Sequence, residues 1–474
     1  MNVKALGIYL GDARLGTLFR YGDDVQPILR FVADDGYARA DETPVLSLSM
    51  LADRPEAQRA LWANVTSRLF NGRYSNRNGW LLPPFFQGLL PEGVFRDHVA
   101  AVRGCDPRDH FEMLAACGRD LPGNVYARPV VLDREQLTHL VTQDADSLEM
   151  TVTAEPMDDG VSVSGVQPKV GVIRDGDRYV GRTRMRDTHI IAKLPVVGYA
   201  LLPELEALSL ELARAAGVDA CEARLEPLAK LAVEHRYDLG QAGAQTAFLA
   251  VTRFDRAPGT RFHVEDFAQI LGVQPEDKYS RSYLEVAAVM LAIPSMGEAA
   301  VHELLRRMTV NELLGNPDMH LKNIGVIYRD GRTPSLSPAY DIVAYSAYQR
   351  RSGHALFILP PRLPPRGPSA KTAGAGTTVE QDAVGTDRGA LPAGKPALSP
   401  AMLRTFCNRL GLLERPASAV IRKTVLAASK HWPRMIADAP LTTRQKANLE
   451  AHLEAHPLIV SLRRRGQRAE ASAD

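Results

Sequence analysis

Three polar residues in the second half of the chain have the types and the spacing of a phosphoryl-transfer site. Asp318 and Asn323 lie in the segment GNPDMHLKN, and Asp341 follows in SPAYDI. An aspartate five residues before an asparagine is the spacing at which a catalytic loop holds its base and a metal ligand. Amide and carboxylate oxygens suit Mg²⁺, which takes one or two protein ligands together with water and substrate phosphates. The pattern therefore predicts a base beside a magnesium site.

A hairpin is expected to bring the two metal ligands together. Residues 324–328 form an apolar run, Asp330 and Gly331 make a turn that tolerates positive φ, and the chain then returns. Because the two ends of a hairpin meet, we expect Asn323 and Asp341 to lie within a few residues' width of each other.

The loop that carries Asp318 follows an amphipathic helix predicted over about 297–314. His320 and Lys322 share this loop and are candidates to stabilise phosphate charge. Taken singly, each residue also has an ordinary interpretation, since Asn-Pro-Asp and Tyr-Asp pairs are usually turn chemistry. Their clustering before a hairpin that returns an aspartate favours the chemical interpretation.

A candidate phosphate-binding segment, SVSGVQPK, begins at Ser162. Gly165 allows a close approach of the backbone, and the N–H groups of Gly165, Val166 and Gln167 are placed to cradle phosphates. Ser162 and Ser164 are two hydroxyls at this segment. A Ser-Gly pair is equally a plain turn, so the order of the surrounding parts decides between the two interpretations.

A single lysine, Lys193, stands in the strand-like segment HIIAKLP. It either contacts phosphates or extends from an edge strand to water. Glu206 lies in a helix predicted from Pro203 to Gly217, where it either pairs with Lys193 or forms a salt bridge on the helix face. These parts follow one another in the order found in a protein-kinase-like ATP site. The order is a glycine loop, a strand lysine, a further strand, the Asp318 loop and a hairpin aspartate.

Length and composition describe an ordinary globular protein of two or three domains. The chain has 474 residues, is 45% hydrophobic and 24% charged, and carries a net charge of +2, which argues against a broad nucleic-acid footprint. Four scattered cysteines suggest no disulfide framework, and no long apolar run or signal-peptide pattern is present. We therefore expect a cytoplasmic protein without membrane contact, in which the basic run 463–465 is a solvated end.

The predicted fold class is α+β. Residues 3–33 read as a small antiparallel sheet, residues 46 to about 140 as helical, residues from 162 to 254 as a second sheet with one helix, and the remainder as mostly helical. Residues 361–400 lack aromatic side chains and are dense in Pro, Gly and Ala, so we expect a flexible insert. The predicted domains are 1–145, 146–256 and 257–474.

The chain resembles the HipA-like serine/threonine kinase toxins of type II toxin-antitoxin systems. The resemblance is carried, in family order, by LLPEG (89–93), FEMLAACGRDLPGNV (111–125), SVSGVQPK (162–169), HIIAKLP (189–195), AVTRFDR (250–256), GNPDMHLKN (315–323) and SPAYDI (337–342). It implies a protein-kinase-like two-lobed fold with an N-terminal β-rich subdomain and a mostly helical C-terminal lobe, and ATP between the lobes.

The resemblance also implies a role for each matching residue. Asp318 would be the catalytic base, and Asn323 and Asp341 would hold Mg²⁺. Ser162 matches the position at which family members phosphorylate themselves, and Ser164 resembles the second hydroxyl of a Ser-x-Ser loop. Within the site, Thr252 to Phe254 would meet adenine, mainly through backbone groups, and Asp255 or His320 would lie near the ribose or phosphates. The residues that would contact ATP are Lys193, Thr252, Phe254, Asp255, His320, Gly165, Val166 and Gln167.

The same resemblance implies partners. They are a HipB-like helix-turn-helix antitoxin and a protein substrate such as an aminoacyl-tRNA synthetase. The kinase would contact DNA only indirectly, through the antitoxin. An alternative from another class is a catalytically idle binding module that acts with an antitoxin as a transcriptional co-repressor. A further alternative keeps the chemistry and changes the acceptor to a small molecule or a lipid head group.

Overall fold

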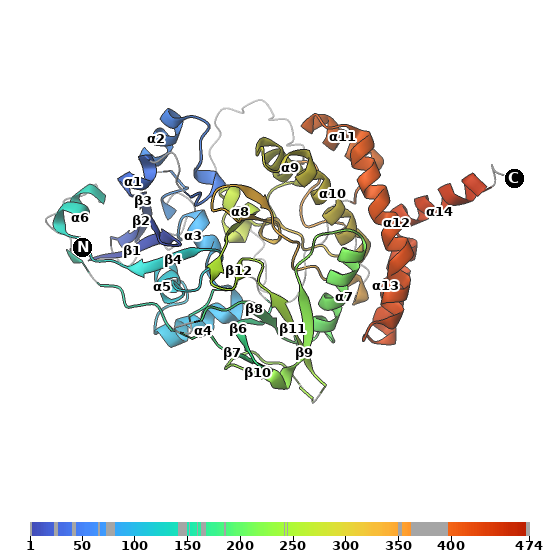
Figure 1. Cartoon of the computed structure of the whole chain (residues 1–474), viewed down its shortest axis with the longest axis horizontal. Coiled ribbons are helices and arrows are strands. Elements are labelled where there is room, and N and C mark those ends of the chain that lie inside the picture. Colours follow the sequence, from blue (N-terminus) through green and yellow to red (C-terminus); the bar gives the residue numbers. More distant parts are fainter. Residues whose placement is uncertain are drawn as a thin grey trace, which may run out of the picture.

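The computed structural model is built from three parts of the chain (Figure 1). They are an N-terminal domain, a small β lobe and a helical lobe. The described residues are 2–22, 27–39, 44–64, 67–72, 81–140, 149–150, 152–158, 160–162, 167–183, 186–240, 242–243, 245–348, 353–361 and 397–470. The predicted insert lies almost entirely outside them, as do Ser164, Gly165 and Val166.

The N-terminal sheet is antiparallel in its main part, as predicted for residues 3–33. β1 (Asn2–Leu10) lies between β2 (Ala13–Tyr21) and β4 (Val125–Pro129), and β3 (Ile28–Ala33) flanks β2. The prediction of helix alone over 46–140 is wrong at β4, because five residues are too few to show a period and β4 is held by its ladder to β1. The remaining elements are β5 (Glu149–Met150), α1 (Asp35–Arg39), η1 (Leu48–Met50), α2 (Pro55–Ala63), α3 (Pro84–Gly88), α4 (Gly93–Arg103), α5 (His110–Ala116) and α6 (Arg134–Leu140).

The β lobe is built on a six-stranded sheet in the order β10-β7-β6-β8-β11-β9. Helix α7 (Leu202–Ala215) packs on it through buried Leu205, Leu208 and Leu212, which confirms the predicted apolar stripe. Strand β8 is central, so the lysine that it carries lies inside the sheet. The strands are β6 (Lys169–Asp175), β7 (Arg178–Val180), β8 (Ile190–Lys193), β9 (Ala223–Pro227), β10 (Leu231–Ala232) and β11 (Ala247–Thr252).

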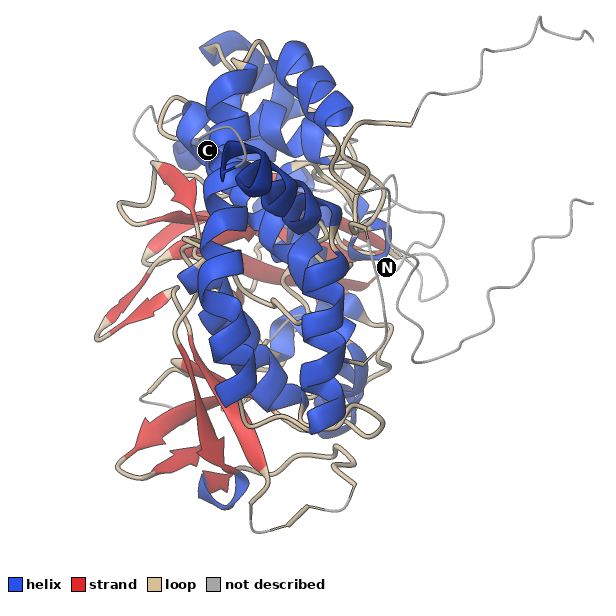
Figure 2. Cartoon of the chain, turned by 90° about the vertical axis from the view of Figure 1, so that its right-hand side faces the viewer, coloured by secondary structure: helices blue, strands red, loops and turns tan. Residues whose placement is uncertain are grey.

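The helical lobe confirms the predicted helix and hairpin. Helix α10 (Gly297–Leu314) precedes the Asp318 loop, and β15 (Gly325–Tyr328) pairs with β16 (Pro334–Leu336). Strand β14 (His263–Asp266) adds a third strand, and Trp432 of α12 (Glu414–Asp438) donates a hydrogen bond to the Leu212 carbonyl of α7 at 2.9 Å. The other elements are β12 (Arg256–Ala257), β13 (Thr260–Arg261), α8 (Phe267–Ile270), α9 (Tyr283–Ala292), α11 (Pro400–Leu410), α13 (Thr443–Ala455) and α14 (Pro457–Glu470). Figure 2 shows the long helices side by side in front of the strands.

Three expectations from composition can be compared with the structure. The four cysteines are free, which confirms the absence of a disulfide framework. The arginines at 463–465 are exposed on α14, as expected for a solvated end. Within the described ranges, no helix combines the length and the apolar character needed to cross a bilayer.

A buried glutamate, Glu265 on β14, joins the helical lobe to the N-terminal domain. Its carboxylate accepts hydrogen bonds from the Ser47 hydroxyl at 2.6 Å, from the Leu48 N–H at 3.0 Å and from the Tyr328 hydroxyl. Burial raises the pKa of Glu265 to about 7 despite these donors. The carboxyl group therefore takes up a proton more readily in the folded protein than in the unfolded chain.

This raised pKa predicts a stability that falls as pH rises. The contribution of protonated Glu265 is fully present below the unfolded pKa of about 4.5 and is lost as pH rises through about 7. Glu265→Gln, which keeps the shape without the charge, should therefore gain on the order of 3 kcal/mol relative to the parent chain between pH 5 and pH 8. Urea denaturation of both proteins at the two pH values measures this difference. A difference that does not change with pH would contradict the prediction.

Candidate functional site

The loop of residues 315–323 is held by its own side chains. Helix α10 ends at Gly315, whose φ of 63° allows the chain to leave the helix sharply. The Asn316 amide donates to the Asn311 side chain at 2.6 Å, and the Asn323 amide nitrogen donates to the Asp318 carbonyl at 2.8 Å. With its nitrogen engaged, Asn323 retains its amide oxygen for a cation. This oxygen fits a hard cation such as Mg²⁺.

Asp318 is partly buried beside an aromatic hydroxyl. Tyr279 donates a hydrogen bond to its carboxylate at 2.5 Å, and the side chain is 26% exposed. Burial raises the pKa of Asp318, and the Asp341 charge adds to this effect. Burial also lowers the pKa of neighbouring His320 to about 3, with help from Lys278 and Lys322, so this imidazole is neutral at physiological pH. Asp318 is thus a carboxylate with increased proton affinity that still has access to solvent.

Asp341 lies where the predicted hairpin returns. The Tyr340 hydroxyl donates to the Lys322 carbonyl at 2.8 Å, which joins the two ends of the hairpin. Asp341 adopts a φ of 53°, a left-handed conformation that costs a residue with a side chain about 1–3 kcal/mol. Although burial opposes ionisation, the ammonium groups of Lys193 and Lys169 lower the pKa of Asp341. The protein therefore holds a strained, ionised carboxylate at this position.

Lys193 joins the two lobes of the site. Its ammonium group bonds both the Glu206 carboxylate of α7 and the Asp341 carboxylate. The side chain is only 5% exposed on a central strand, so the interpretation of a lysine reaching water from an edge strand is wrong. Glu206 is fully buried, which also excludes a salt bridge on the solvent face of the helix.

Two residues of this centre were not singled out from the sequence. Lys169 on β6 lies opposite Lys193 in the β6–β8 pairing and is 3% exposed. Lys169 is the last residue of the SVSGVQPK segment and the first residue of a buried strand. A charged residue at such a position was the sequence signal that could have identified it. Tyr279, the donor to Asp318, lies 39 residues away in sequence, in a segment without any motif.

The predicted adenine-binding segment follows β11. The Thr252 N–H donates to the Glu222 carbonyl at 2.8 Å, and the Phe254 ring packs at 5.6 Å against Tyr340. Asp255 is engaged by Arg253 and Arg256 at 2.7–3.0 Å and by the Gly123 N–H at 2.8 Å. A ribose contact by Asp255 stays a prediction, and it would have to compete with these bonds.

The predicted phosphate-binding segment is described only at its ends. Ser162 is buried, where its hydroxyl donates to the Leu89 carbonyl and its N–H to the Asp120 carbonyl at 3.0 Å. Gln167 is partly buried, and its amide nitrogen has no hydrogen-bond partner within the described part of the chain. Such an unpaired donor fits a phosphate oxygen. The roles predicted for Ser164, Gly165 and Val166 fall outside the described residues.

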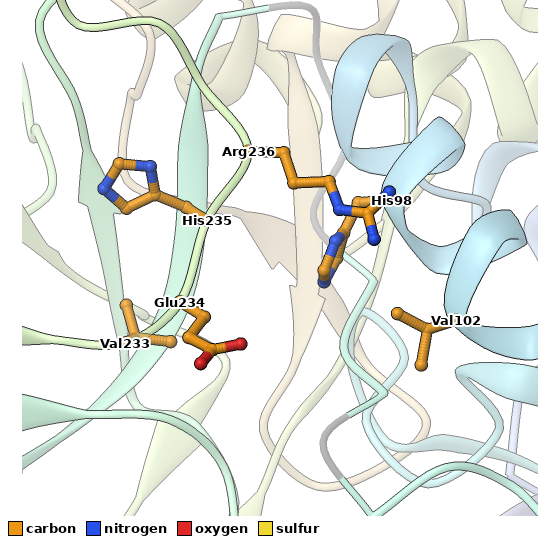
Figure 3. Close-up of a pocket in the computed structure, with 6 residues that line it drawn as sticks. All are labelled: His98, Val102, Val233, Glu234, His235 and Arg236. Carbon is orange, nitrogen blue, oxygen red and sulfur yellow. The ribbon is translucent and has the colours of Figure 1, made fainter.

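A pocket of about 430 Å³ lies elsewhere, between α4 and the segment after β10 (Figure 3). None of the residues predicted to carry chemistry lines it. We therefore place the candidate site at the Lys193–Asp341 pair, where charged groups from both lobes meet. The pocket is lined by His98, Val102, Val233, Glu234, His235 and Arg236.

Fold and site together define a protein of the HipA-like kinase class. The family model of the HipA N-terminal domain matches residues 6–128, and that of the HipA-like C-terminal domain matches residues 161–432. The chain belongs to this family, which confirms the resemblance and the α+β, kinase-like fold class. The domain boundaries at 145 and 256 stay predictions.

Relatives and a solved structure agree with this assignment. "Putative kinase Y4dM" of Sinorhizobium fredii is 34% identical over 67% of this chain and 72% of its own length. "Putative kinase Y4mE" of the same organism is 30% identical over 56% of this chain and 64% of its own length. HipA of Shewanella oneidensis MR-1, solved with HipB and operator DNA, has the same fold at a TM-score of 0.60. It is 20% identical, and the match covers 95% of this chain and 97% of that one.

Proposed function

We propose that the chain is an ATP- and Mg²⁺-dependent serine/threonine protein kinase of the toxin type. The observation that carries the proposal is the buried Lys193 ammonium group, which bonds both Glu206 and Asp341. A lysine placed between a helix glutamate and a metal-binding aspartate is what a kinase uses to align phosphates. A scaffold without catalysis has no use for such a charge, because burying it costs free energy.

Each residue has a role that its surroundings support. Asp318 accepts the proton of the substrate hydroxyl, and its raised pKa makes it a better proton acceptor. Asn323 and Asp341 would hold Mg²⁺ through their oxygens. Bound Mg²⁺-ATP supplies the phosphoryl group and the cation that neutralises its charge. Lys193 would orient the ATP phosphates through its own positive charge.

The first prediction compares the parent chain with Asp318→Asn. With Mg²⁺ and γ-labelled ATP, the parent should become labelled, whereas the variant should react about 10²- to 10⁴-fold more slowly because it lacks a general base. Mass spectrometry locates the label and thermal denaturation checks that both proteins are folded. A folded, unphosphorylated parent that transfers no label to itself or to candidate proteins would favour the idle binding module.

Regulation and partners extend the proposal. A HipB-like antitoxin is the proposed partner, since the structural neighbour from Shewanella oneidensis was solved with HipB and operator DNA. A component of translation, such as an aminoacyl-tRNA synthetase, is the proposed substrate. Loop phosphorylation at Ser162 or Ser164 is the proposed off-switch, because a phosphate adds a charge of about −1.5 to −2 beside the ATP phosphates.

The buried hydroxyl of Ser162 makes this switch testable. Ser162 must break its bond to the Leu89 carbonyl before it can accept a phosphoryl group. We expect parent activity to decline during incubation with Mg²⁺-ATP, whereas Ser162→Ala combined with Ser164→Ala should keep its initial rate. Time courses of substrate phosphorylation measure both. Equal decline in the two proteins would exclude the switch.

A further inference from the structure

One loop of the N-terminal domain reaches both ends of the candidate site. Between α3 and α4, the Leu89 carbonyl accepts the Ser162 hydroxyl, and Glu92 Oε1 lies 2.7 Å from Lys322 Nζ in the catalytic loop. Glu92 directly precedes α4, yet its side chain makes no capping hydrogen bond there. Helix capping therefore does not explain where this carboxylate lies.

Lys322 connects the parts of the loop that carry the chemistry. Its side chain is 3% exposed, and its carbonyl accepts the Tyr340 hydroxyl next to Asp341. The following residue, Asn323, bonds the Asp318 carbonyl. A displacement of Lys322 would therefore shift Asp318 and Asn323 together. It would also disturb the Tyr340 contact next to Asp341.

The ionisation of Glu92 agrees with an ion pair to Lys322. Burial opposes ionisation of Glu92, but the ammonium groups of Lys322 and Lys278, with a smaller effect from Lys169, lower its pKa to about 2. Glu92 is thus a carboxylate at physiological pH. A buried ammonium group such as that of Lys322 needs an anion nearby, because an unpaired buried charge is strongly unfavourable.

We propose that Glu92 is a positioning residue of the phosphotransfer site. By pairing with Lys322, it fixes the loop that carries Asp318 and Asn323 and makes the N-terminal domain a structural part of the site. This inference rests on the proposed function. It adds a residue that contacts neither nucleotide nor acceptor and acts only through Lys322.

The test compares Glu92→Gln with Glu112→Gln in the full chain. Glu112 is a matched control, since it lies in the same domain, is 12% exposed against 15% for Glu92, and pairs with Lys4 at 2.7 Å and Arg103 at 3.1 Å, neither of which belongs to the loop. Loss of an outer partner that orients a functional group lowers activity about 10- to 100-fold. We expect this loss in kcat for Glu92→Gln alone, with a smaller change in KM for ATP.

A second readout does not depend on activity. Without nucleotide, hydrogen–deuterium exchange of residues 315–324 should speed up in Glu92→Gln and remain unchanged in Glu112→Gln. Glu92→Asp, which keeps the charge on a shorter side chain, should recover part of both properties and serves if Glu92→Gln does not fold.

The outcomes separate this inference from the proposed function. An active parent with equally active Glu92→Gln and Glu92→Asp variants, or with unchanged exchange in the loop, would overturn the role of Glu92. A parent that transfers no phosphate would refute the proposed function, and the exchange data would still decide whether Glu92 holds the loop.

Discussion

Replacing Lys193 by methionine should strongly slow phosphotransfer and weaken the fold at the same time. The variant keeps the length of the side chain and removes the ammonium group that bonds Glu206 and Asp341. Loss of one electrostatic contact to a reacting group typically costs about 10²- to 10³-fold in kcat. Breaking a buried ion pair by removing one partner costs about 3–5 kcal/mol, because the other charge stays buried.

The cost should fall at the lower end of this range. Burial raises the pKa of Glu206, the Lys193 charge lowers it, and the Asp341 charge raises it further. The net pKa is raised, so the carboxyl group can take up a proton when Lys193 is lost. A raised pKa means that stability is present at low pH and is lost as pH rises. The deficit of Lys193→Met should therefore shrink as pH falls, which urea denaturation at several pH values measures.

A second substitution separates stability from function. Lys193→Met combined with Glu206→Leu removes the two charges of the buried Lys193–Glu206 pair, and apolar replacement of such a pair is often neutral or stabilising. We expect the double variant to regain stability and to remain inactive. Lys230→Met is the control, since Lys230 bridges Asp177 and Glu226 at the surface of the same lobe, and it should retain activity. An active Lys193→Met variant would contradict the role of this lysine.

Local pattern was sufficient to predict the elements that carry the site. The helix at 297–314, the Asp330-Gly331 turn and the strands around it are encoded by periodicity and turn residues over a few positions. The hairpin predicted that its two ends meet, and the bond of the Tyr340 hydroxyl to the Lys322 carbonyl joins them next to Asn323 and Asp341. The pairing of Glu206 with Lys193 was one of two alternatives, and the burial of Glu206 against Lys193 decided between them.

Contacts between distant segments could not be predicted in this way. Glu92 and Lys322 are 230 residues apart in the printed sequence, and no local period relates them. The same holds for Asp255, which the family resemblance predicted to lie near the nucleotide. The structure shows its carboxylate bound by Arg253, Arg256 and the backbone of residue 123. Such contacts depend on how the N-terminal domain docks.

Asp120 is the centre of that docking, and Asp120→Asn should have the second large effect. This aspartate is fully buried in the N-terminal domain, where it accepts hydrogen bonds from Arg253 at 3.2 Å, from Arg256 at 3.0 Å and from the Thr188 hydroxyl at 2.8 Å. Burial opposes its ionisation, yet Arg253, Arg256 and Arg261 lower its pKa. The carboxylate thus ties the segment after β11 to the first domain.

Removing this charge leaves Asp255 as the carboxylate that both buried guanidinium groups, those of Arg253 and Arg256, still bond. We expect Asp120→Asn to lose about 3–5 kcal/mol of unfolding free energy at pH 7. Because the pKa of Asp120 is lowered, its contribution is present above the unfolded pKa of about 4 and is lost as pH falls further. Denaturant titrations at pH 7 and pH 3 measure how far the difference in unfolding free energy between the parent and the variant narrows.

Asp106→Asn is the matched control for Asp120→Asn. Asp106 lies in the same domain and bonds Arg108 at 2.8 Å, but both side chains are largely exposed, so water replaces the lost bond. Its stability should therefore equal that of the parent. Because residues 252–254 belong to the segment that Asp120 holds through Arg253 and Arg256, KM for ATP should rise in Asp120→Asn and not in the control. Equal stability and equal KM in the two variants would mean that the N-terminal domain does not hold this segment in place.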